Sequence, residues 1–347
     1  MNYLICQDWT NTSNNHAGIK YLCLQLEEKY KKECKAIVIP DYIGSQIAKH
    51  SKLTRKFYIW LARRKFNKFI KKITNELNKQ LIEGDKVFLL EYMEKLVPQY
   101  KLACEIKKSH PEIDIYAMVH LIPKKLDNSF TDLEFKQWIK PIDKFITLGS
   151  SLTDYLGNRG INKNKIITSF HYVENEYYKP QSHKAIGANI QVIAMGNQER
   201  NVNLLREVVA NNPTVNFIIC QGVSDLSAQF KGLHNVKLIP FVEEEELRKL
   251  MDESDISLNI MNDTIGSNVI VTSMAMGLAM ICSDVGSIRD YCDEDNCIFC
   301  DNNVKSFSNA VNSLVTDKIR LAKYKESSIN KSKEINISNF YLSIKTR

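Results

Sequence analysis

Residues 262–290 read NDTIGSNVIVTSMAMGLAMICSDVGSIRD, a pattern of loop, helix, turn, strand and second turn. Gly266-Ser267-Asn268 places a flexible residue and two residue types that favour helix N-caps directly before an apolar run. Residues 269–276 therefore predict a short buried helix, which Gly277 ends at the position after the C-cap. Residues 278–282 predict a buried strand. Because backbone N–H groups and the helix dipole both favour phosphate at a helix start, we expect an anion site near Gly266.

Short apolar strands alternate with helices along both halves of the chain. In the first half we expect a helix at 17–30 and strands at 2–7, 36–40, 86–91, 115–120 and 144–148. In the second half we expect strands at 190–194, 216–220, 236–239, 256–259 and 279–282, and helices at 202–211, 226–230, 243–253, 268–276 and 305–315. This alternation predicts an α/β protein with two doubly wound, Rossmann-like parallel sheets. Ligands then bind beyond the carboxyl ends of the strands.

The length of 347 residues favours two domains over a single core. We expect an N-terminal domain at 1–170, a linker at 171–184, a second domain at 185–326 and a tail at 327–347. The tail either forms a final helix that docks on the first domain or frays.

Composition points to a protein of the reducing cytoplasm. Hydrophobic residues make up 44% and charged residues 25% of the chain, which is ordinary globular composition. The first residues lack a signal-peptide pattern, so we expect the nine cysteines to be free thiols. Cys292, Cys297 and Cys300 match no standard zinc spacing. No apolar run reaches the roughly 18 residues that span a bilayer.

Positive charge is concentrated in residues 49–73. The net charge is +7, and residues 49–72 contain ten Lys or Arg and no acidic residue. Aromatic and aliphatic residues interleave with them in a pattern that predicts two amphipathic helical stretches. Such a segment suits an anionic membrane surface, which would place the protein peripherally at the inner face of the plasma membrane. The alternatives to a membrane-binding segment are a solvated outer helix face and a nucleic-acid-binding surface. We do not expect nucleic acid as a partner.

Five segments, in order, resemble the GT-B glycosyltransferases, in particular the large retaining family 4 type that includes bacterial polysaccharide and lipopolysaccharide enzymes. Ser273-Met-Ala-Met-Gly-Leu-Ala-Met-Ile-Cys resembles that family's Glu-Ala-Met-Ala-x-Gly-x-Pro-Val-Val run. The other four segments are residues 147–167, the linker at 170–180, a glycine turn at 194–201, and a strand and turn at 235–247. The resemblance implies a GT-B fold, in which two Rossmann-like domains face a cleft.

The resemblance also implies an activity. A sugar would pass from a nucleotide-sugar donor to a glycan acceptor, which we expect to be lipid-linked, without a metal or another cofactor. The family carries two glutamates eight positions apart, and we place their positions at Ile265 and Ser273, which are not acidic. Asp263 either contacts the donor sugar instead or is a solvated loop residue. Two alternatives therefore remain, a non-catalytic GT-B-shaped binding subunit and a sugar-nucleotide epimerase.

The predicted site residues fall into three groups. Arg200 is expected to reach the donor phosphates, or else is an ordinary residue at a helix start. His120 ends an apolar strand, where an imidazole either serves catalysis with Asp263 or is a structural histidine. The loop after the first strand offers polar side chains to an acceptor, although Asn15 and His16 could instead cap the next helix. His171 and Glu174 of the linker are further candidates at the cleft border. The expected donor-binding residues are Gly196, Arg200, Phe241, Gly266, Ser267, Asn268, Val269 and Ser273, and the expected acceptor-binding residues are Asp8, Asn15 and His16.

Overall fold

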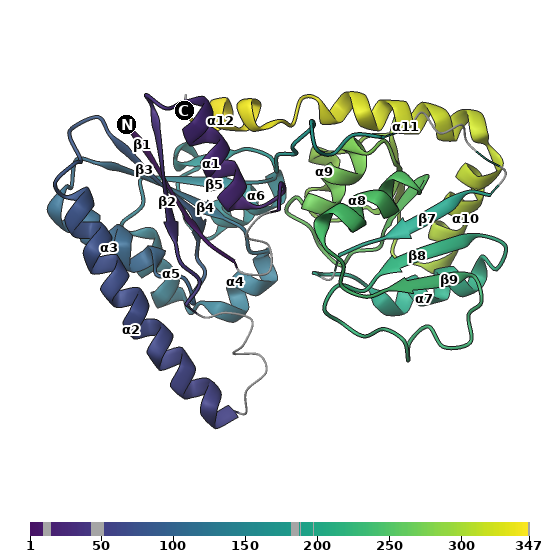
Figure 1. Cartoon of the computed structure of the whole chain (residues 1–347), viewed down its shortest axis with the longest axis horizontal. Coiled ribbons are helices and arrows are strands. Elements are labelled where there is room, and N and C mark those ends of the chain that lie inside the picture. The colour runs from purple at the N-terminus through teal and green to yellow at the C-terminus, as the bar shows by residue number, and fades with distance from the viewer. Residues whose placement is uncertain (10–14, 43–51, 182–186, 188, 197, 346–347) are drawn as a thin grey trace. The chain divides into compact units, whose positions relative to one another are not determined.

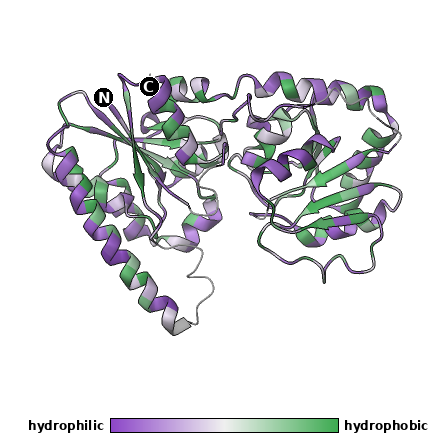
Figure 2. Cartoon of the chain, in the orientation of Figure 1, coloured by the Kyte–Doolittle hydropathy of each residue, from purple (hydrophilic) through white to green (hydrophobic). Residues whose placement is uncertain are grey.

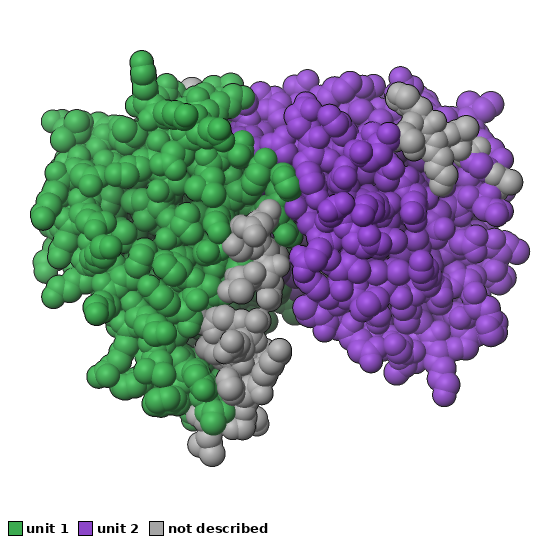
Figure 3. Space-filling model, in the orientation of Figure 1, with its two compact units in different colours: residues 1–148, 152–169, 341–347 green, residues 149–151, 170–340 purple. Residues whose placement is uncertain are grey.

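A six-stranded parallel sheet forms the centre of each half of the molecule. The computed structural model describes residues 1–9, 15–42, 52–181, 187, 189–196 and 198–345. It divides into two units, coloured green and purple in Figure 3. Unit 1 comprises Met1–Leu148, Leu152–Ser169 and Tyr341–Arg347, and unit 2 comprises Gly149–Ser151 and Phe170–Phe340.

The sheet of unit 1 has the strand order β2-β1-β3-β4-β5-β6, with every neighbouring pair parallel (Figure 1). Its strands are β1 (Asn2–Gln7), β2 (Cys34–Ile39), β3 (Lys86–Tyr92), β4 (Asp114–Val119), β5 (Lys144–Thr147) and β6 (Ile166–Thr168). Its helices are α1 (Ile19–Lys29), α2 (Lys52–Leu77), α3 (Gln99–Ser109), α4 (Pro123–Ser129), α5 (Asp132–Ile139), α6 (Ser150–Asn158) and the 3-10 turn η2 (Lys163–Lys165).

The sheet of unit 2 has the strand order β12-β11-β10-β7-β8-β9, again with every neighbouring pair parallel. Its strands are β7 (Gln191–Ala194), β8 (Asn216–Cys220), β9 (Val236–Ile239), β10 (Ile256–Asn259), β11 (Ala279–Ser283) and β12 (Cys297–Cys300). Its helices are α7 (Val202–Asn211), α8 (Glu244–Asp252), α9 (Asn268–Ala275), α10 (Val304–Thr316), α11 (Lys318–Ser332) and the 3-10 turn η3 (Ile288–Asp290).

The last helix, α12 (Ile337–Lys345), carries the chain back to unit 1. Its Tyr341 side chain is fully buried there, and the tyrosine hydroxyl accepts a hydrogen bond of 2.6 Å from the Asn2 amide on β1. The end of the chain is thus tied to its beginning.

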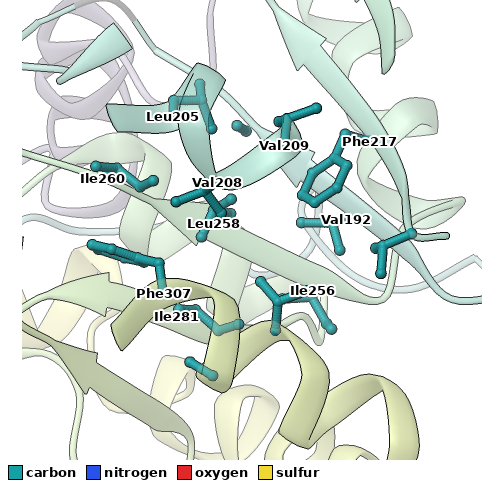
Figure 4. Close-up of a cluster of buried hydrophobic side chains, with 14 of the residues drawn as sticks. Val192, Leu205, Val208, Val209, Phe217, Ile256, Leu258, Ile260, Ile281 and Phe307 are labelled. Carbon is teal, nitrogen blue, oxygen red and sulfur yellow. The ribbon is translucent and has the colours of Figure 1, made fainter. Parts of the chain in front are cut away.

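Apolar side chains of the central strands fill the core of unit 2. Ile256 and Leu258 of β10 pack with Val208 of α7 and Phe307 of α10, and none of these side chains is more than 1% exposed (Figure 4). Figure 2 shows the same pattern by hydropathy, with green strands inside and helices that alternate between purple and green. Because helices cover both faces of a parallel sheet, its strands are buried on both sides.

Local sequence explains the bounds of α9. The Ser267 hydroxyl accepts a hydrogen bond from the N–H of Val269 and caps the start of the helix. At the other end Gly277 has a φ of +69°, which glycine adopts without strain. The N–H of Gly277 donates to the Met274 carbonyl, and the N–H of Leu278 donates to the Ser273 carbonyl. These two bonds form a Schellman motif, which ends the helix.

The structure confirms the predicted fold class of two doubly wound parallel sheets. Two predicted elements were wrong. The basic region forms one continuous helix, α2, rather than two stretches, because Ala62, Phe66 and Ile70 continue a single buried face at four-residue spacing. Residues 226–230 form turns rather than a helix. In the described part of the chain, no helix combines the length and apolar character needed to cross a membrane.

Candidate functional site

The strand order of unit 2 reverses between β7 and β10, and this reversal marks the expected ligand-binding crevice. The chain leaves β7 toward β8 on one side and leaves β10 toward β11 on the other, although β7 and β10 are neighbours. Ligands of doubly wound sheets bind at such a switch point, outside the carboxyl ends of the strands. The segments that follow the two strands meet there, since Arg200 forms a β-bridge with Met261 and the N–H of Asn262 donates to the Glu199 carbonyl at 2.8 Å.

Gly196 brings three predicted donor-binding residues together. Its φ is +86°, and a Cβ atom added there would lie 3.1 Å from Cγ2 of Val269 and 3.2 Å from Nη2 of Arg200. A larger residue at this position would therefore press on both the guanidinium and the first turn of α9. Gly196, Arg200 and Val269 form one cluster at the switch point.

Arg200 is a half-buried cation that has no acidic partner among the described residues. Its Nη1 donates to Oδ1 of Asn259 at 3.2 Å, and its Nε is buried without a hydrogen-bond partner. None of the ion pairs among the described residues includes Arg200. Burial lowers the pKa of Arg200 to about 10, so the guanidinium stays charged at neutral pH. Burying an uncompensated charge is costly, and an anionic ligand would remove that cost.

A pocket of about 60 Å³ lies beside this cluster. Gly196 and Arg200 line it together with Cys220, Ser224 and Leu226, which follow or end β8. The pocket therefore extends from the guanidinium toward the next strand of the sheet.

The start of α9 presents two of the other predicted residues. Gly266 has a φ of +108°, and Asn268 is exposed at the first helical position. Ser267 serves as the N-cap, so its hydroxyl bonds to the helix itself. Because Val269 of the same turn lies against Gly196, the positive end of the α9 dipole and the Arg200 cation belong to one electropositive site.

Asp263 lies between this loop and the turn after β11. Its Oδ1 accepts a hydrogen bond of 2.8 Å from the N–H of Thr264, and a Cβ atom at Gly286 would come within 2.5 Å of that oxygen. Gly286 thus lets the two loops touch. Burial, followed by the nearby charge of Glu199, raises the pKa of Asp263.

Ser273 and Ile265 are buried instead of facing a ligand. The Ser273 side chain is fully buried, and its hydroxyl lies 2.9 Å from the Ser257 hydroxyl within unit 2. The family run has its glutamate five residues before the glycine, which from Gly277 is Thr272. Counted from that glycine, the glutamate of the run would fall one residue before Ser273. The two acidic positions correspond to Thr264 and Thr272, which are again not acidic.

Phe241 lies two residues beyond β9, the edge strand of the sheet, and its side chain is 50% exposed. It shares the carboxyl end of the sheet with Arg200 but follows a different strand. The structure does not bring it into the cluster at Gly196.

In unit 1, the predicted residues also follow strand ends. His120 comes directly after β4 and is half-buried. Asp8 follows β1 and pairs with Lys20 at 3.1 Å. The His16 ring lies 4.7 Å from the ring of Tyr21. Gly18 is the N-cap of α1, so neither Asn15 nor His16 caps that helix.

Sequence reasoning missed Glu91, which is buried at the end of β3. Its carboxylate accepts hydrogen bonds from the Gln7 N–H and from the Trp9 indole, and burial raises the pKa of Glu91 to about 7. Since β1 and β3 are neighbours and flank the switch point of this sheet, Glu91 holds the segment that leads to Asp8. The signal in the sequence was an acid after the apolar run Val87-Phe-Leu-Leu.

The two linker candidates have local roles. Burial lowers the pKa of the His171 imidazole to about 4, and the backbone N–H of His171 donates to the Tyr291 hydroxyl. The Glu174 carboxylate accepts a hydrogen bond from the N–H of Glu176.

The acidic triplet Asp293-Glu294-Asp295 follows η3. Asp293 pairs with Lys331, and Asp295 pairs with Lys323 at 3.2 Å. These pairs give the outer two carboxylates lysine partners. Over the residues described here, no group of three or more His, Cys, Asp or Glu is arranged to hold a metal ion.

Comparison with known proteins agrees with this architecture. Residues 191–317 match the family model described as Glycosyl transferases group 1. No match was found among curated protein sequences.

Solved structures match the whole chain at low identity. HepE of Anabaena in complex with UDP and glucose is 12% identical, with a TM-score of 0.69 over 99% of this chain and 97% of that chain. Sucrose-phosphate synthase of Thermosynechococcus elongatus is 12% identical, with a TM-score of 0.72 over 99% and 96%. A glycosyltransferase of Rickettsia africae is 12% identical, with a TM-score of 0.68 over 100% and 99%. These likenesses show that the chain has the GT-B fold.

Proposed function

We propose that this protein is a glycosyltransferase that takes a sugar from a nucleotide-sugar donor. The observation that carries the proposal is the Arg200 guanidinium at the switch point of unit 2, whose Nε is buried and which has no acidic partner in the described part of the chain. The diphosphate of the donor supplies the missing anion. The family match over the same unit supports this reading, as does the presence of UDP in HepE of Anabaena.

The proposed chemistry places charge stabilisation at Arg200 and at α9. When the bond between the anomeric carbon and the diphosphate breaks, negative charge grows on the leaving phosphate. A cation and a helix dipole already fixed there stabilise that charge, and one such preorganised donor is worth about 10²–10³ in rate. We propose that the reaction needs no metal, because these two features take its place.

Asp263 and His120 are the proposed catalytic side chains in their respective units. Asp263 follows β10, close to the start of α9, and its raised pKa suits a group that exchanges hydrogen bonds with sugar hydroxyls. His120 follows β4 in unit 1, where Asp8 and His16 would contact the acceptor. Retention of anomeric configuration is part of the proposal on the strength of the sequence resemblance alone.

The acceptor that we propose is a glycan on a lipid, as used in polysaccharide or lipopolysaccharide synthesis. Its support is the exposed face of α2. Phe57, Tyr58 and Trp60 are 57%, 41% and 47% exposed, and the Arg64 guanidinium lies 4.1 Å from the centroid of the Trp60 ring. Figure 1 shows this end of α2 projecting beyond the strands of unit 1. Exposed aromatic rings among cations match the interface of an anionic membrane.

A second candidate is a binding subunit without catalysis. The observation in its favour is that Thr264 and Thr272 occupy the positions where the family has glutamates. Such a protein would bind the nucleotide at Arg200 and leave the sugar untouched. The sequence offers no recognisable carboxylate pair for an epimerase.

Screening separates these candidates. The purified chain is heated with UDP, GDP, ADP, CMP and their sugar conjugates, and the conjugate that stabilises it is then tested for sugar release with a membrane extract as acceptor. We expect one nucleoside diphosphate to raise the Tm and its conjugate to turn over. Stabilisation without turnover would favour the binding subunit, and an absence of stabilisation by every nucleotide would contradict both candidates.

A further inference from the structure

Three polar side chains are buried in the middle of unit 2 where apolar residues are the rule. Ser257 and Asn259 on β10 and Ser273 on α9 are each at most 1% exposed. Ile256 and Leu258 alternate with them along the strand and join the apolar core. Buried polar groups cost free energy unless they are hydrogen-bonded, so a sequence that places three of them together calls for an explanation.

These side chains form a continuous hydrogen-bonded chain that ends at a cation. The Ser273 and Ser257 hydroxyls lie 2.9 Å apart. The Asn259 amide nitrogen donates to the Ser257 hydroxyl at 2.9 Å, and Oδ1 of Asn259 accepts from Nη1 of Arg200 at 3.2 Å. The guanidinium determines which way the amide points, because it can only donate and only the amide oxygen can accept from it.

The kind of side chain at position 259 decides whether the Arg200 guanidinium keeps its net positive charge. A carboxylate at position 259 would bind the guanidinium more strongly, but it would also cancel the positive charge. An amide oxygen fixes the same group and leaves that charge in place. The rest of the guanidinium lies toward Gly196. A Cβ atom added to that glycine would lie 3.4 Å from Nε and 3.2 Å from Nη2 of Arg200.

We propose that Asn259, held by Ser257 and Ser273, is a positioning residue that orients Arg200 for an anionic ligand without neutralising it. This inference rests on the proposed function, since the anion would be the donor diphosphate. It also gives Ser273 a role that differs from direct contact with the donor. Asn259 acts through Arg200 and touches no reacting atom.

Four variants and one probe test the proposal. The probe is inorganic pyrophosphate, and its affinity is measured by calorimetry for the full chain after circular dichroism has confirmed folding. Arg200→Met removes the cation at similar length, Asn259→Asp adds a carboxylate, and Asn259→Ala removes the contact without adding charge. Asn212→Asp is the matched control, because Asn212 is also buried in unit 2 but caps the far end of α7.

Arg200→Met should weaken pyrophosphate binding about 10- to 100-fold, the range for losing a charged hydrogen bond. Asn259→Asp should weaken it by a similar factor and should flatten its dependence on salt, because the new ion pair cancels the charge. Asn259→Ala should lose a smaller factor of about 3 to 10. Asn212→Asp should stay within about twofold of the wild type, as expected for a distant site.

A double variant separates positioning from a structural role. If Asn259 acts only through Arg200, then Asn259→Ala should have no further effect in the Arg200→Met background. A further loss in that background, or full affinity in both Asn259 variants while Arg200→Met is weak, would overturn the inference and leave the proposed function standing. Full affinity in Arg200→Met would instead overturn the proposed function, and the inference with it.

Discussion

Arg200, which is half-buried, and Glu91, which is buried, are ionisable side chains at the switch points of the two sheets. Arg200 keeps its charge because its pKa falls only to about 10, whereas Glu91 has a pKa of about 7. The difference follows from the intrinsic values, since a guanidinium starts far above neutral pH and a carboxyl starts below it. Burial therefore leaves one group permanently charged and makes the other sensitive to pH.

Glu91 should make unfolding depend on pH. Its folded pKa of about 7 exceeds the unfolded value of about 4.3, so the folded protein binds the proton more tightly. The stability from this group is complete below about pH 4 and is lost as the pH rises to about 7, by about 2–3 kcal/mol between pH 5 and pH 8. Urea unfolding of the wild type and of Glu91→Gln at both pH values measures the difference.

His171 changes the stability in the opposite direction as the pH rises, so its contribution must be separated from that of Glu91. Its pKa is lowered to about 4 by burial, so its contribution grows as the pH rises from about 4 to about 6.5. That contribution is common to both proteins and cancels in their difference. Equal pH dependence in the wild type and in Glu91→Gln would mean that the carboxyl is not held in its protonated form near neutral pH.

At the scale of elements, α9 could be predicted in detail because its signals are local. Ser267 caps it, Gly277 ends it, and the apolar run between them must be buried. The same was true of β8, β9 and β10, whose apolar runs have clear ends. Three helices of unit 1, α4, α5 and α6, were missed, although the capping box of Thr131 and Glu134 marks the start of α5. Residues 226–230 failed because one apolar turn lacks the length of a stable helix.

A negative charge at the start of α9 should have opposite effects on stability and on binding. Asn268 is exposed at the first position of the helix. Asn268→Asp should stabilise the helix by about 0.3–1 kcal/mol through the dipole, yet it should weaken binding of a nucleoside diphosphate by repulsion. The two quantities are measured by thermal unfolding and calorimetry.

Asn303→Asp provides the control for that variant. Asn303 caps α10, where an aspartate should also favour the helix. Nucleotide affinity should remain unchanged in this case. If Asn268→Asp also left the affinity unchanged, the diphosphate would not lie at the start of α9.

The α2 surface should bind anionic vesicles through its cations. Neutralising Arg63, Arg64, Lys65 and Lys68 together should release the protein, because each cation near such a surface is worth about 1 kcal/mol. High salt should have the same effect. Vesicle co-sedimentation measures binding, with nucleotide affinity as the readout that should not change.

A variant with equal loss of charge tests whether position matters. Four exposed lysines of unit 1 outside α2 are Lys31, Lys32, Lys79 and Lys108. Neutralising these should leave vesicle binding largely intact. Equal release by both sets, or no binding of the wild type at low salt, would show that α2 is not a membrane surface.

At the scale of the whole molecule, the alternation of strands and helices predicted the fold class but not the strand order. The order 2-1-3-4-5-6 in unit 1 and 3-2-1-4-5-6 counted within unit 2 depends on which strands pair over long distances. Local periodicity carries no such information. For that reason Arg200 could be proposed from its sequence context, whereas its contact with Asn259 and the role of Glu91 could not.

Sugar transfer should continue in the presence of EDTA. Arg200 and the start of α9 would stabilise the leaving diphosphate, and Asp293 and Asp295 are paired with lysines. Turnover of the donor found by screening, measured with and without EDTA, should agree within about twofold. Loss of activity that Mg²⁺ or Mn²⁺ restores would show that a metal ion carries part of this charge.

The central claim is that a donor diphosphate binds at Arg200. Calorimetric titration of the wild type and of Arg200→Met with UDP, GDP and ADP tests it most directly. We predict that the wild type binds one of these nucleotides and that Arg200→Met binds it more weakly by about 1.5–3 kcal/mol, while remaining folded. Equal affinity in the two proteins, or no binding of any nucleotide by the wild type, would contradict the claim.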